Sequence, residues 1–541
     1  MSSTNRPANH LYYGDNLDVL RREIGDGTVD LVYLDPPFNS NANYNILFRS
    51  PTGDSADAQI EAFEDTWHWN DRAEDAFDQV ARSGHTKAFD LLNAMRGFLG
   101  DNDMMAYLAM MAVRLVELHR VLKPTGSLYL HCDPTASHYL KLLLDGVFGA
   151  RNYRNEIVWK RTSAHGDAAT AFGDVTDTIF YYARTDRPTW NRLFVPLDPA
   201  HVAAKYTGRD SDGRRFTTRD LRSPSPRPNL TYDFKGYRPH ANGWSISRER
   251  MEQYDREGLL VFPASIDGRI RMKIYLDERR GTPLQNLWDD IAPLNSQAQE
   301  RLGYPTQKPL ALLERIIAAS SNEGDVVLDP FCGCGTAVHA AQKLHRQWIG
   351  IDVTHLAISL IEKRMQAAFP GVAFTVEGTP KDLASAEDLA RRDKYQFQWW
   401  AVSMVDAMPY GGRKKGADGG IDGIIYFKPD GRRTERALVS VKGGEHVGVP
   451  MIRDLHSAMT REKATAAVFV TRSLPTKPME REAAAAGRFT APATGKSYPR
   501  LQIITLAELF RGRRPDLPYI DPSAAFRRAP REDGGRQGSL L

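Results

Sequence analysis

A buried strand that ends on two consecutive prolines is the feature that most constrains this chain. Residues 29–34 form an apolar run, which predicts a buried strand of a parallel sheet. Asp35-Pro36-Pro37-Phe38 follows directly. The prolines fix backbone φ, remove two N–H donors and hold Asp35 in extended geometry. The sequence therefore predicts a stiff corner that presents a carboxylate, carbonyl groups and an aromatic ring at the carboxyl end of a strand.

Such a corner suits an amino group that is carried by an aromatic ring. The Asp35 carboxylate and the Pro36 carbonyl can accept the two hydrogens of the amine, and Phe38 can stack on the ring. A proline-terminated strand with an incidental acid and phenyl ring is the alternative interpretation of these residues alone. The rest of the chain decides between the two.

The bulk composition excludes several classes of protein. The chain has 541 residues, which predicts about three or four folded units. It contains no apolar run long enough to span a bilayer, and its first ten residues are polar without a signal-peptide core. Its three cysteines, Cys132, Cys332 and Cys334, form no disulfide framework, which indicates a reducing, cytoplasmic location. Cys332 and Cys334 lack the further ligands that a zinc site needs.

A glycine-rich loop far along the chain predicts a cofactor site. Residues 325–328 are expected to form a buried strand, and residues 329–336 read Asp-Pro-Phe-Cys-Gly-Cys-Gly-Thr. A helix over 337–344 and a strand over 347–351, ending at Asp352, complete the pattern. Glycines let the backbone approach a nucleotide-type ligand, and an acid after the next strand can hold ribose hydroxyls. The spacing matches neither a dinucleotide fingerprint nor an ATP phosphate loop.

A basic stretch separates the two strand-end motifs. Residues 201–280 contain 17 Lys and Arg against 11 Asp and Glu, an excess larger than the net charge of +4 of the whole chain. Aromatic residues interleave with these cations, a pattern that suits contact with a phosphate backbone. A solvated basic surface is the alternative. We expect this stretch to form an insertion with its own small fold outside the sheet.

Three motifs together resemble those of the DNA amino-methyltransferases, which use S-adenosylmethionine. They are Asp35-Pro36-Pro37-Phe38, the loop at 329–336, and Tyr304-Pro305-Thr306-Gln307-Lys308-Pro309, where the family has His in place of Tyr304. Their order resembles the β-class permutation, in which an insertion recognises the target sequence. The resemblance covers roughly residues 8–370. It implies an α/β, Rossmann-like S-adenosylmethionine-dependent methyltransferase fold with circularly permuted motifs.

The resemblance also implies the residues of the site. Asp352 would bind the ribose, where relatives often carry Glu, and residues 306–308 would lie near the methionine end of the cofactor. Asp15 would lie by the adenine of the cofactor, although the sequence alone suits a helix cap equally well. The cofactor-binding residues expected in this way are Asp15, Thr306, Gln307, Lys308, Asp329, Phe331, Gly333, Gly335, Thr336 and Asp352.

The catalytic residues expected in the same way are Asp35, Pro36, Pro37 and Phe38. They would hold a base flipped out of double-stranded DNA, so positioning and hydrogen bonds would carry the reaction without a covalent intermediate. Adenine N6 is favoured as the target because cytosine-N4 enzymes often have Ser at the position of Asp35. Cytosine N4 is the alternative target.

The segment after residue 370 resembles an Mrr-type restriction-endonuclease-like domain. Residues 384–407 look helical, Asp422 precedes a strand at 424–427, and a turn leads to a strand at 437–442 that ends at Lys442. An acid and a Lys in this layout suit Mg²⁺-dependent DNA cleavage, with Asp422 as metal ligand. Ser440 stands where that family has Glu or Gln. The sequence therefore leaves two possibilities open: an active nuclease, or a fold retained for DNA binding or partner contact.

The expected domain boundaries follow from these motifs. We expect a catalytic half (1–185), a target-recognition insertion (186–300), a cofactor-binding half (301–370), an α/β restriction-endonuclease-like domain (385–512) and a flexible basic tail (513–541). Two alternatives to a DNA methyltransferase are a single-chain restriction-modification nuclease and a non-catalytic DNA-binding protein. The expected partners are double-stranded DNA and, by analogy with β-class relatives, a second copy or other defence-system subunits.

Overall fold

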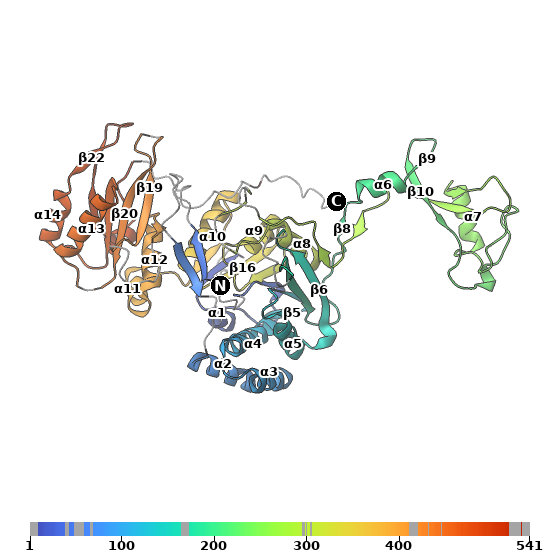
Figure 1. Cartoon of the computed structure of the whole chain (residues 1–541), viewed down its shortest axis with the longest axis horizontal. Helices are drawn as coiled ribbons and strands as arrows, with labels where there is room; N and C mark the ends of the chain where they lie inside the picture. The colour runs from blue at the N-terminus through green and yellow to red at the C-terminus, as the bar shows by residue number, and fades with distance from the viewer. Residues whose placement is uncertain are drawn as a thin grey trace, which may run out of the picture. The chain divides into compact units, whose positions relative to one another are not determined.

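The computed structural model describes residues 9–37, 43–47, 59–64, 69–163, 172–294, 298, 300–302, 304, 306–410, 420–430, 432–444, 446–518 and 532. Residues 192–285 form a compact unit of their own, and the main unit comprises the chain before and after it (Figure 1). In the described part of the chain, no helix is both long and apolar enough to cross a membrane.

A nine-stranded, mostly parallel sheet forms the centre of the main unit. In spatial order its strands are β14 (Leu287–Trp288), β6 (Tyr153–Lys160), β7 (Thr176–Ala183), β5 (Leu122–Cys132), β2 (Val29–Leu34), β15 (Val326–Asp329), β16 (Gln347–Asp352), β1 (His10–Tyr13) and β17 (Thr375–Glu377). The helices connected to this sheet are α1 (Asn16–Glu23), α2 (Asp71–Arg82), α3 (Thr86–Leu99), α4 (Asp103–Val121), α5 (Ser137–Phe148), α8 (Leu310–Ser320), α9 (Thr336–Lys343) and α10 (His355–Ala368).

The pairing of β2 with β15 determines where the two sequence motifs meet. These strands are parallel neighbours, with Leu31 opposite Val327 and Val32 opposite Leu328. Every residue of β2 is buried, including Asp30, as its mostly apolar sequence predicts for a central parallel strand. The carboxyl ends of both strands therefore lie side by side, although the motifs lie far apart in the sequence. The fold thus joins the two strand-end motifs at one edge of the sheet.

Two local predictions differ from the structure. The apolar run after the Lys-Pro-Thr-Gly turn predicts a strand over 127–131. In the structure β5 already begins at Leu122, which pairs with Val29, and the Lys-Pro-Thr-Gly segment forms an irregularity within the strand. The length of the polar, aromatic stretch 39–69 and its lack of a sustained period predict a substrate-contacting or lid loop. Within it, however, β3 (Asn43–Leu47) and β4 (Gln59–Glu64) pair antiparallel. Polar and apolar residues alternate over the first four residues of each strand, which is the period of a strand.

The separate unit of residues 192–285 has a small core. Its four-stranded sheet has the order β11 (Leu260–Val261), β12 (Arg271–Tyr275), β10 (Arg215–Asp220) and β9 (Gly208–Arg209). Its other elements are β8 (Phe194–Val195), which pairs with β13 (Thr282–Pro283), and the helices α6 (Pro199–Lys205) and α7 (Arg248–Arg256). The core consists of Leu221, Phe234, Trp244, Met251, Leu260 and Ile270. Few apolar residues therefore hold an unusually basic segment together.

The C-terminal part of the main unit contains a second sheet of five strands. Its order is β18 (Met408–Pro409), β19 (Gly423–Phe427), β20 (Glu435–Lys442), β21 (Ala466–Thr471) and β24 (Leu501–Thr505), and β22 (Arg488–Thr490) pairs separately with β23 (Ser497–Pro499). The helices are α11 (Leu383–Arg392), α12 (Lys394–Met404), α13 (Val449–Arg461), α14 (Lys477–Ala485) and α15 (Leu506–Phe510). The predicted hairpin is confirmed, because β19 and β20 pair antiparallel.

One predicted helix in this region consists of two. The expected helix over 384–407 breaks at Asp393, which ends α11 and caps α12. The Asp393 carboxylate accepts hydrogen bonds from the backbone N–H groups of Tyr395 and Gln396, each at 3.0 Å. A short acidic side chain in this position satisfies N–H groups that a helix start leaves open. The break sets the direction of α12 independently of α11.

Candidate active site

A cavity of about 570 Å³ lies at the carboxyl ends of β2, β15 and β16. Ligands of open α/β sheets bind at this edge of the sheet. The cavity walls include most of the residues that the sequence motifs single out: Asp15, Asp35, Pro36, Pro37, Thr306, Lys308, Asp329, Phe331, Gly333, Thr336 and Asp352.

Two of the expected site residues are placed differently, and a third lies outside the described part of the chain. Gln307 is not among the lining residues; its side chain accepts a hydrogen bond from the Leu302 N–H and donates one to the Glu300 carbonyl, so it fixes the turn before α8. Gly335 also lies apart from the cavity wall, at the N-terminal cap of α9. Phe38 lies outside the described residues.

Asp35 and Lys308 form the central contact of the cavity. The Lys308 Nζ donates to Asp35 Oδ2 at 2.5 Å, and both side chains are largely buried. Asp35 Oδ1 is also buried, and it accepts no hydrogen bond from any described residue. A buried acceptor in this state is costly unless a donor reaches it. One oxygen of the carboxylate is therefore fixed by the protein, and the other can accept an N–H group of a ligand.

A buried polar chain lies behind this corner. The Tyr33 hydroxyl, in the cavity wall, contacts His131 Nδ1 at 3.0 Å, and His131 Nε2 contacts Asp177 Oδ2 at 3.0 Å. Burial and the negative charge of Asp35 raise the pKa of Tyr33 well above its ordinary value, so the phenol stays protonated. Sequence reasoning missed these residues because Tyr33 and His131 lie inside strands, where they look like ordinary core positions.

Asp352 ties the glycine-rich loop to the end of β16. Its Oδ2 accepts from the Gly333 N–H at 2.9 Å, and its Oδ1 accepts from the Thr354 N–H and hydroxyl, each at 2.8 Å. Burial raises the pKa of Asp352 to about 6. Gly333 has φ +48°, and a Cβ there would lie 3.3 Å from the Tyr304 ring. The loop backbone therefore approaches the cavity at a position where a larger side chain would be strained and crowded.

Asp329 begins the same loop from the end of β15. Its carboxyl is buried and accepts a hydrogen bond from the Phe331 N–H at 3.1 Å. Burial, together with the nearby charges of Asp35 and Asp352, raises the pKa of Asp329 well above its ordinary value. The Asp329 carboxyl therefore keeps its proton to a higher pH than an exposed aspartic acid does.

Asp15 performs the role of a helix cap and also lines the cavity. Its Oδ1 accepts from the Leu17 N–H at 2.8 Å, and both of its oxygens accept from Arg114 Nη2 at 3.1 Å. The neighbouring Asn16 donates to the Pro330 carbonyl at 2.8 Å, which links the start of α1 to the glycine-rich loop. Arg114 and Asn16 are buried polar residues that belong to none of the sequence motifs.

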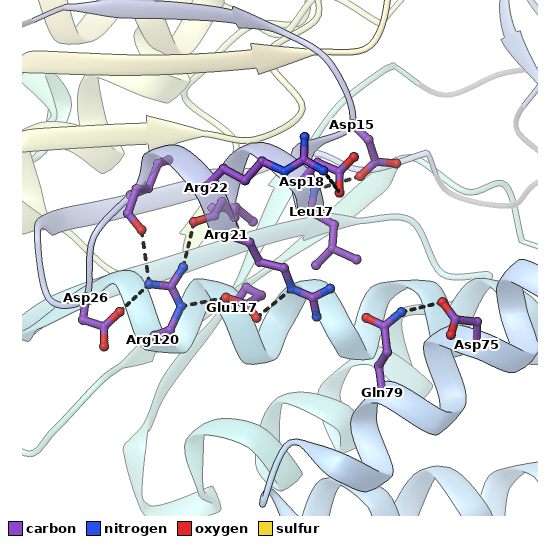
Figure 2. Close-up of polar contacts among 12 residues, drawn as sticks. Asp15, Leu17, Asp18, Arg21, Arg22, Asp26, Asp75, Gln79, Glu117 and Arg120 are labelled. Carbon is purple, nitrogen blue, oxygen red and sulfur yellow. Dashed lines mark hydrogen bonds and ion pairs between the residues drawn. The ribbon is translucent and has the colours of Figure 1, made fainter. Parts of the chain in front are cut away.

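A polar network on α4 holds the other end of α1. Arg120 donates to the carbonyls of Leu20 at 2.7 Å and Ile24 at 3.1 Å, and Arg21 of α1 donates to Glu117 at 3.0 Å (Figure 2). These bonds satisfy carbonyl groups that the end of a helix leaves open. With α1 held at both ends, Asp15 is kept in place at the cavity.

A second acid–lysine pair lies in the C-terminal sheet. Asp422 Oδ1 accepts from the Gln398 amide at 2.6 Å, and Oδ2 accepts from the Val441 N–H at 2.5 Å. Ser440 Oγ and Lys442 Nζ lie 3.4 Å and 3.7 Å from Oδ2. Burial raises the pKa of Asp422. The structure thus brings Asp422 and Lys442 together, but protein donors already contact both oxygens of the carboxylate.

This second centre does not fit Mg²⁺ on the described residues. Mg²⁺ prefers several oxygen ligands and at least one or two carboxylates. Among the side chains that the structure describes, no group of three or more His, Cys, Asp or Glu is placed to hold a metal ion. Asp422 is the one carboxylate among the described residues that contacts Ser440 and Lys442.

Comparisons with known proteins divide the chain into a methylase part and an endonuclease-like part. Residues 29–363 match the N6/N4 DNA methylase family, and residues 389–506 match a restriction endonuclease family of the Mrr type. The type II methyltransferase M.EcaI of Enterobacter cloacae is 32% identical over 261 residues, 48% of this chain and 57% of the relative. The Mod subunit of the type III restriction-modification enzyme StyLTI of Salmonella typhimurium is 26% identical over 63% of this chain and 51% of the relative.

A third relative is covered over more of its length. The DNA adenine methyltransferase YhdJ of Escherichia coli is 25% identical over 67% of this chain and 84% of the relative. The chain spans only 57% and 51% of the lengths of M.EcaI and the StyLTI Mod subunit. The match to the DNA methylase family, in contrast, extends over more than half of this chain and contains both strand-end motifs. The chain belongs to the family of N6/N4 DNA methylases, and it carries an Mrr-type restriction-endonuclease-like domain after the methylase part.

Proposed function

We propose that this protein transfers a methyl group from S-adenosylmethionine to N6 of an adenine flipped out of double-stranded DNA. The observation that carries this proposal is the state of Asp35: Lys308 holds one carboxylate oxygen, and the other is a buried acceptor in the cavity wall. An exocyclic amine carries N–H donors that can fill this acceptor. Base flipping provides the access that such an amine needs.

The residues of the cavity fit the cofactor. Asp352 suits ribose hydroxyls, Gly333 leaves room for close approach of the backbone, and Phe331 and Thr336 line the same wall. When bound, S-adenosylmethionine supplies an electrophilic methyl group on a sulfonium centre. We propose that the other expected cofactor-binding residues, including Thr306, contact the cofactor together with these four.

Asp35 and Pro36 would prepare the amine. An aromatic amine is a weak nucleophile, because its lone pair is delocalised into the ring. Asp35 Oδ1 and the Pro36 carbonyl each accept one N–H hydrogen, which favours a pyramidal nitrogen with its lone pair directed at the methyl group. The carboxylate also stabilises the positive charge that develops on nitrogen and can take the released proton at Oδ1. Lys308 keeps the carboxylate in this orientation, and Phe38 stacks on the base.

Adenine N6 is preferred to cytosine N4 on two grounds. Asp35 stands where cytosine-N4 enzymes often have Ser, and YhdJ is named a DNA adenine methyltransferase. The test is to incubate the protein with DNA and methyl-labelled cofactor, digest the DNA and identify the labelled nucleoside. We expect labelled N6-methyladenine, and none with Asp35→Asn. Label found only on cytosine N4, or equal labelling by the variant, would contradict the adenine assignment.

The unit of residues 192–285 is proposed to recognise the DNA target. Its many cations and aromatic side chains suit contact with the phosphate backbone and the groove edges. We also propose the domain boundaries that the sequence predicts. They are a catalytic half (1–185), a target-recognition insertion (186–300), a cofactor-binding half (301–370), a restriction-endonuclease-like domain (385–512) and a flexible basic tail (513–541). Cytoplasmic location and assembly with a second copy or other defence-system subunits are further proposals. Light scattering of the purified protein with and without DNA measures the assembly state.

A second proposal concerns Mg²⁺-dependent DNA cleavage by the C-terminal domain. The 3.7 Å separation of Asp422 and Lys442 supports it. The contacts of Asp422 with Gln398 and Val441 oppose it, so we derive no cleavage step. Supercoiled DNA, modified and unmodified, is incubated with the protein and Mg²⁺. Nicking that disappears with Lys442→Ala supports cleavage, and intact DNA on every substrate contradicts it.

A further inference from the structure

Helix α12 of the endonuclease-like domain lines the methyltransferase cavity. Asp393, Gln396 and Trp399 are among the lining residues, and all three lie in the segment that matches the restriction endonuclease family. They are spaced three residues apart, so they share one face of the helix start and its first turns. Phe397 and Trp400 of the same helix pack in the core of the endonuclease-like domain itself. The helix therefore belongs to one domain and faces the cavity of the other.

The contact between α12 and the methylase part is well packed. Gln396 Oε1 accepts a hydrogen bond from the backbone N–H of His355, the first residue of α10, at 3.4 Å. Trp399 is 9% exposed and lies in a hydrophobic cluster with Tyr304 and Leu356 of the methylase part. Buried aromatic residues of this kind contribute much of the energy of an interface.

The wall formed by α12 lies by the end of β16. Asp352, Val353 and Thr354 line the cavity directly before His355, which contacts Gln396. Val353 is an apolar side chain that is 55% exposed, an unusual state for a residue at the end of a central strand. We propose that Gln396 and Trp399 of the endonuclease-like domain bind the adenosine half of the S-adenosylmethionine used by the methylase part, an inference that rests on the proposed function.

The chemistry of this wall suits a nucleoside. A purine has a flat apolar face, and Trp399 and Val353 supply apolar surface in the same cavity. Adenosine also carries an amino group and ribose hydroxyls, for which Gln396 and Asp393 offer polar partners. A mostly apolar pocket with a few placed polar groups is the usual composition of a cofactor site.

The position of α12 depends on the second acid–lysine centre. Gln398, on a face of α12 turned away from that of Gln396, donates to Asp422 at 2.6 Å. Asp422 in turn accepts from the backbone of β20 through the Val441 N–H. This contact fixes the rotation of α12, so the acid that would serve a nuclease also orients a wall of the cofactor pocket. A domain with Ser440 in place of an acidic ligand thus has a role that needs no metal.

The test measures cofactor affinity of the full-length chain by isothermal titration calorimetry. We expect Trp399→Ala to weaken S-adenosylmethionine binding about tenfold or more, and Gln396→Ala and Trp399→Phe about threefold to tenfold. S-adenosylhomocysteine shares the adenosine half, so its affinity should fall by the same factors. Lys394→Ala is the matched control, because Lys394 is an exposed residue of the same helix outside the cavity wall. Circular dichroism verifies that each variant is folded.

Trp399→Phe and Gln396→Ala keep the test informative if Trp399→Ala fails to fold. A second readout is tryptophan fluorescence, whose change on cofactor titration should be smaller in Trp399→Phe than in the unmodified protein. If the unmodified protein binds cofactor and methylates DNA, and both variants bind as tightly as Lys394→Ala, this inference is wrong and the proposed function stands. If the unmodified protein neither binds cofactor nor methylates DNA, the proposed function fails as well.

Discussion

Two of the acid–lysine pairs in the protein, Asp35–Lys308 and Asp422–Lys442, differ in which carboxylate oxygens they leave open to a ligand. Asp35 meets Lys308 at 2.5 Å, and Asp422 meets Lys442 at 3.7 Å. Asp35 keeps one buried oxygen that accepts nothing from the described residues. Asp422, in contrast, accepts from Gln398 at one oxygen and from Val441 at the other. Asp35 therefore offers a buried acceptor to a ligand, whereas the bonds of Asp422 connect α12 to β20 within the endonuclease-like domain.

An Asp→Asn substitution at each acid tests whether that acid acts on a ligand or holds the fold. The larger effect is expected at Asp35. In Asp35→Asn, the amide oxygen can still accept from Lys308, but the NH₂ group replaces the open acceptor and opposes the hydrogens of the target amine. We expect methyl transfer to fall about 10³-fold, since the positioned acceptor is lost, with little change in stability. Single-turnover methylation and thermal unfolding of the same preparation measure both. A large loss of stability with normal methylation would show that Asp35 holds the fold and does not act on the target amine.

Asp422→Asn should show the opposite pattern. Its amide has one acceptor for the two donors, Gln398 and Val441, so one donor must face an NH₂ group. A buried polar group left in this state costs about 2 kcal/mol of unfolding free energy. Urea unfolding followed by fluorescence measures the change, and Asp454→Asn, in an exposed position on α13, is the control. Unchanged stability of Asp422→Asn would mean that its bonds do not hold the domain.

Sequence reasoning found the strand-end motifs but not the contacts that make them a site. The buried run before Asp35 and the Gly-rich loop after Asp329 have local periodicity, so the sequence predicts the strands that carry them. Lys308 reaches Asp35 across 273 residues, and no local pattern encodes that contact. Trp399 has the spacing of an ordinary core residue, and its position in the cavity depends on how the two parts of the main unit pack.

Lys308→Met tests the role of Lys308 in the Asp35–Lys308 pair. The family resemblance assigns Lys308 to the methionine end of the cofactor, whereas its bond to Asp35 assigns it to the orientation of the catalytic acid. If orientation is the main role, kcat should fall about tenfold while cofactor affinity changes little, and Lys308→Arg should recover part of the activity. Stopped-flow methylation and calorimetry separate the two effects. A large loss of affinity at unchanged kcat would favour the cofactor role.

The smallest expected effect is a pH dependence that distinguishes Asp352 from the other acids. Burial raises its pKa from 3.8 to about 6, so the carboxylate that suits ribose hydroxyls is lost as the pH falls through about 6. We expect S-adenosylmethionine affinity to be about fourfold weaker at about pH 5.5 than at neutral pH, because only about a quarter of Asp352 is then ionised. Calorimetry across this range measures the change, and Asp352→Asn should bind weakly with no such dependence.

Destabilisation of the fold by protonation of Asp352 does not account for the expected fall in S-adenosylmethionine affinity. A carboxyl group whose pKa is higher in the folded state binds its proton more tightly there, so protonation of Asp352 between about pH 6 and its ordinary pKa favours the folded protein. Affinity and stability contributions from this one group therefore change in opposite directions as the pH falls. An affinity that stays constant to pH 5, or one that falls in parallel with unfolding, would show that the carboxylate of Asp352 holds the glycine-rich loop without binding the cofactor.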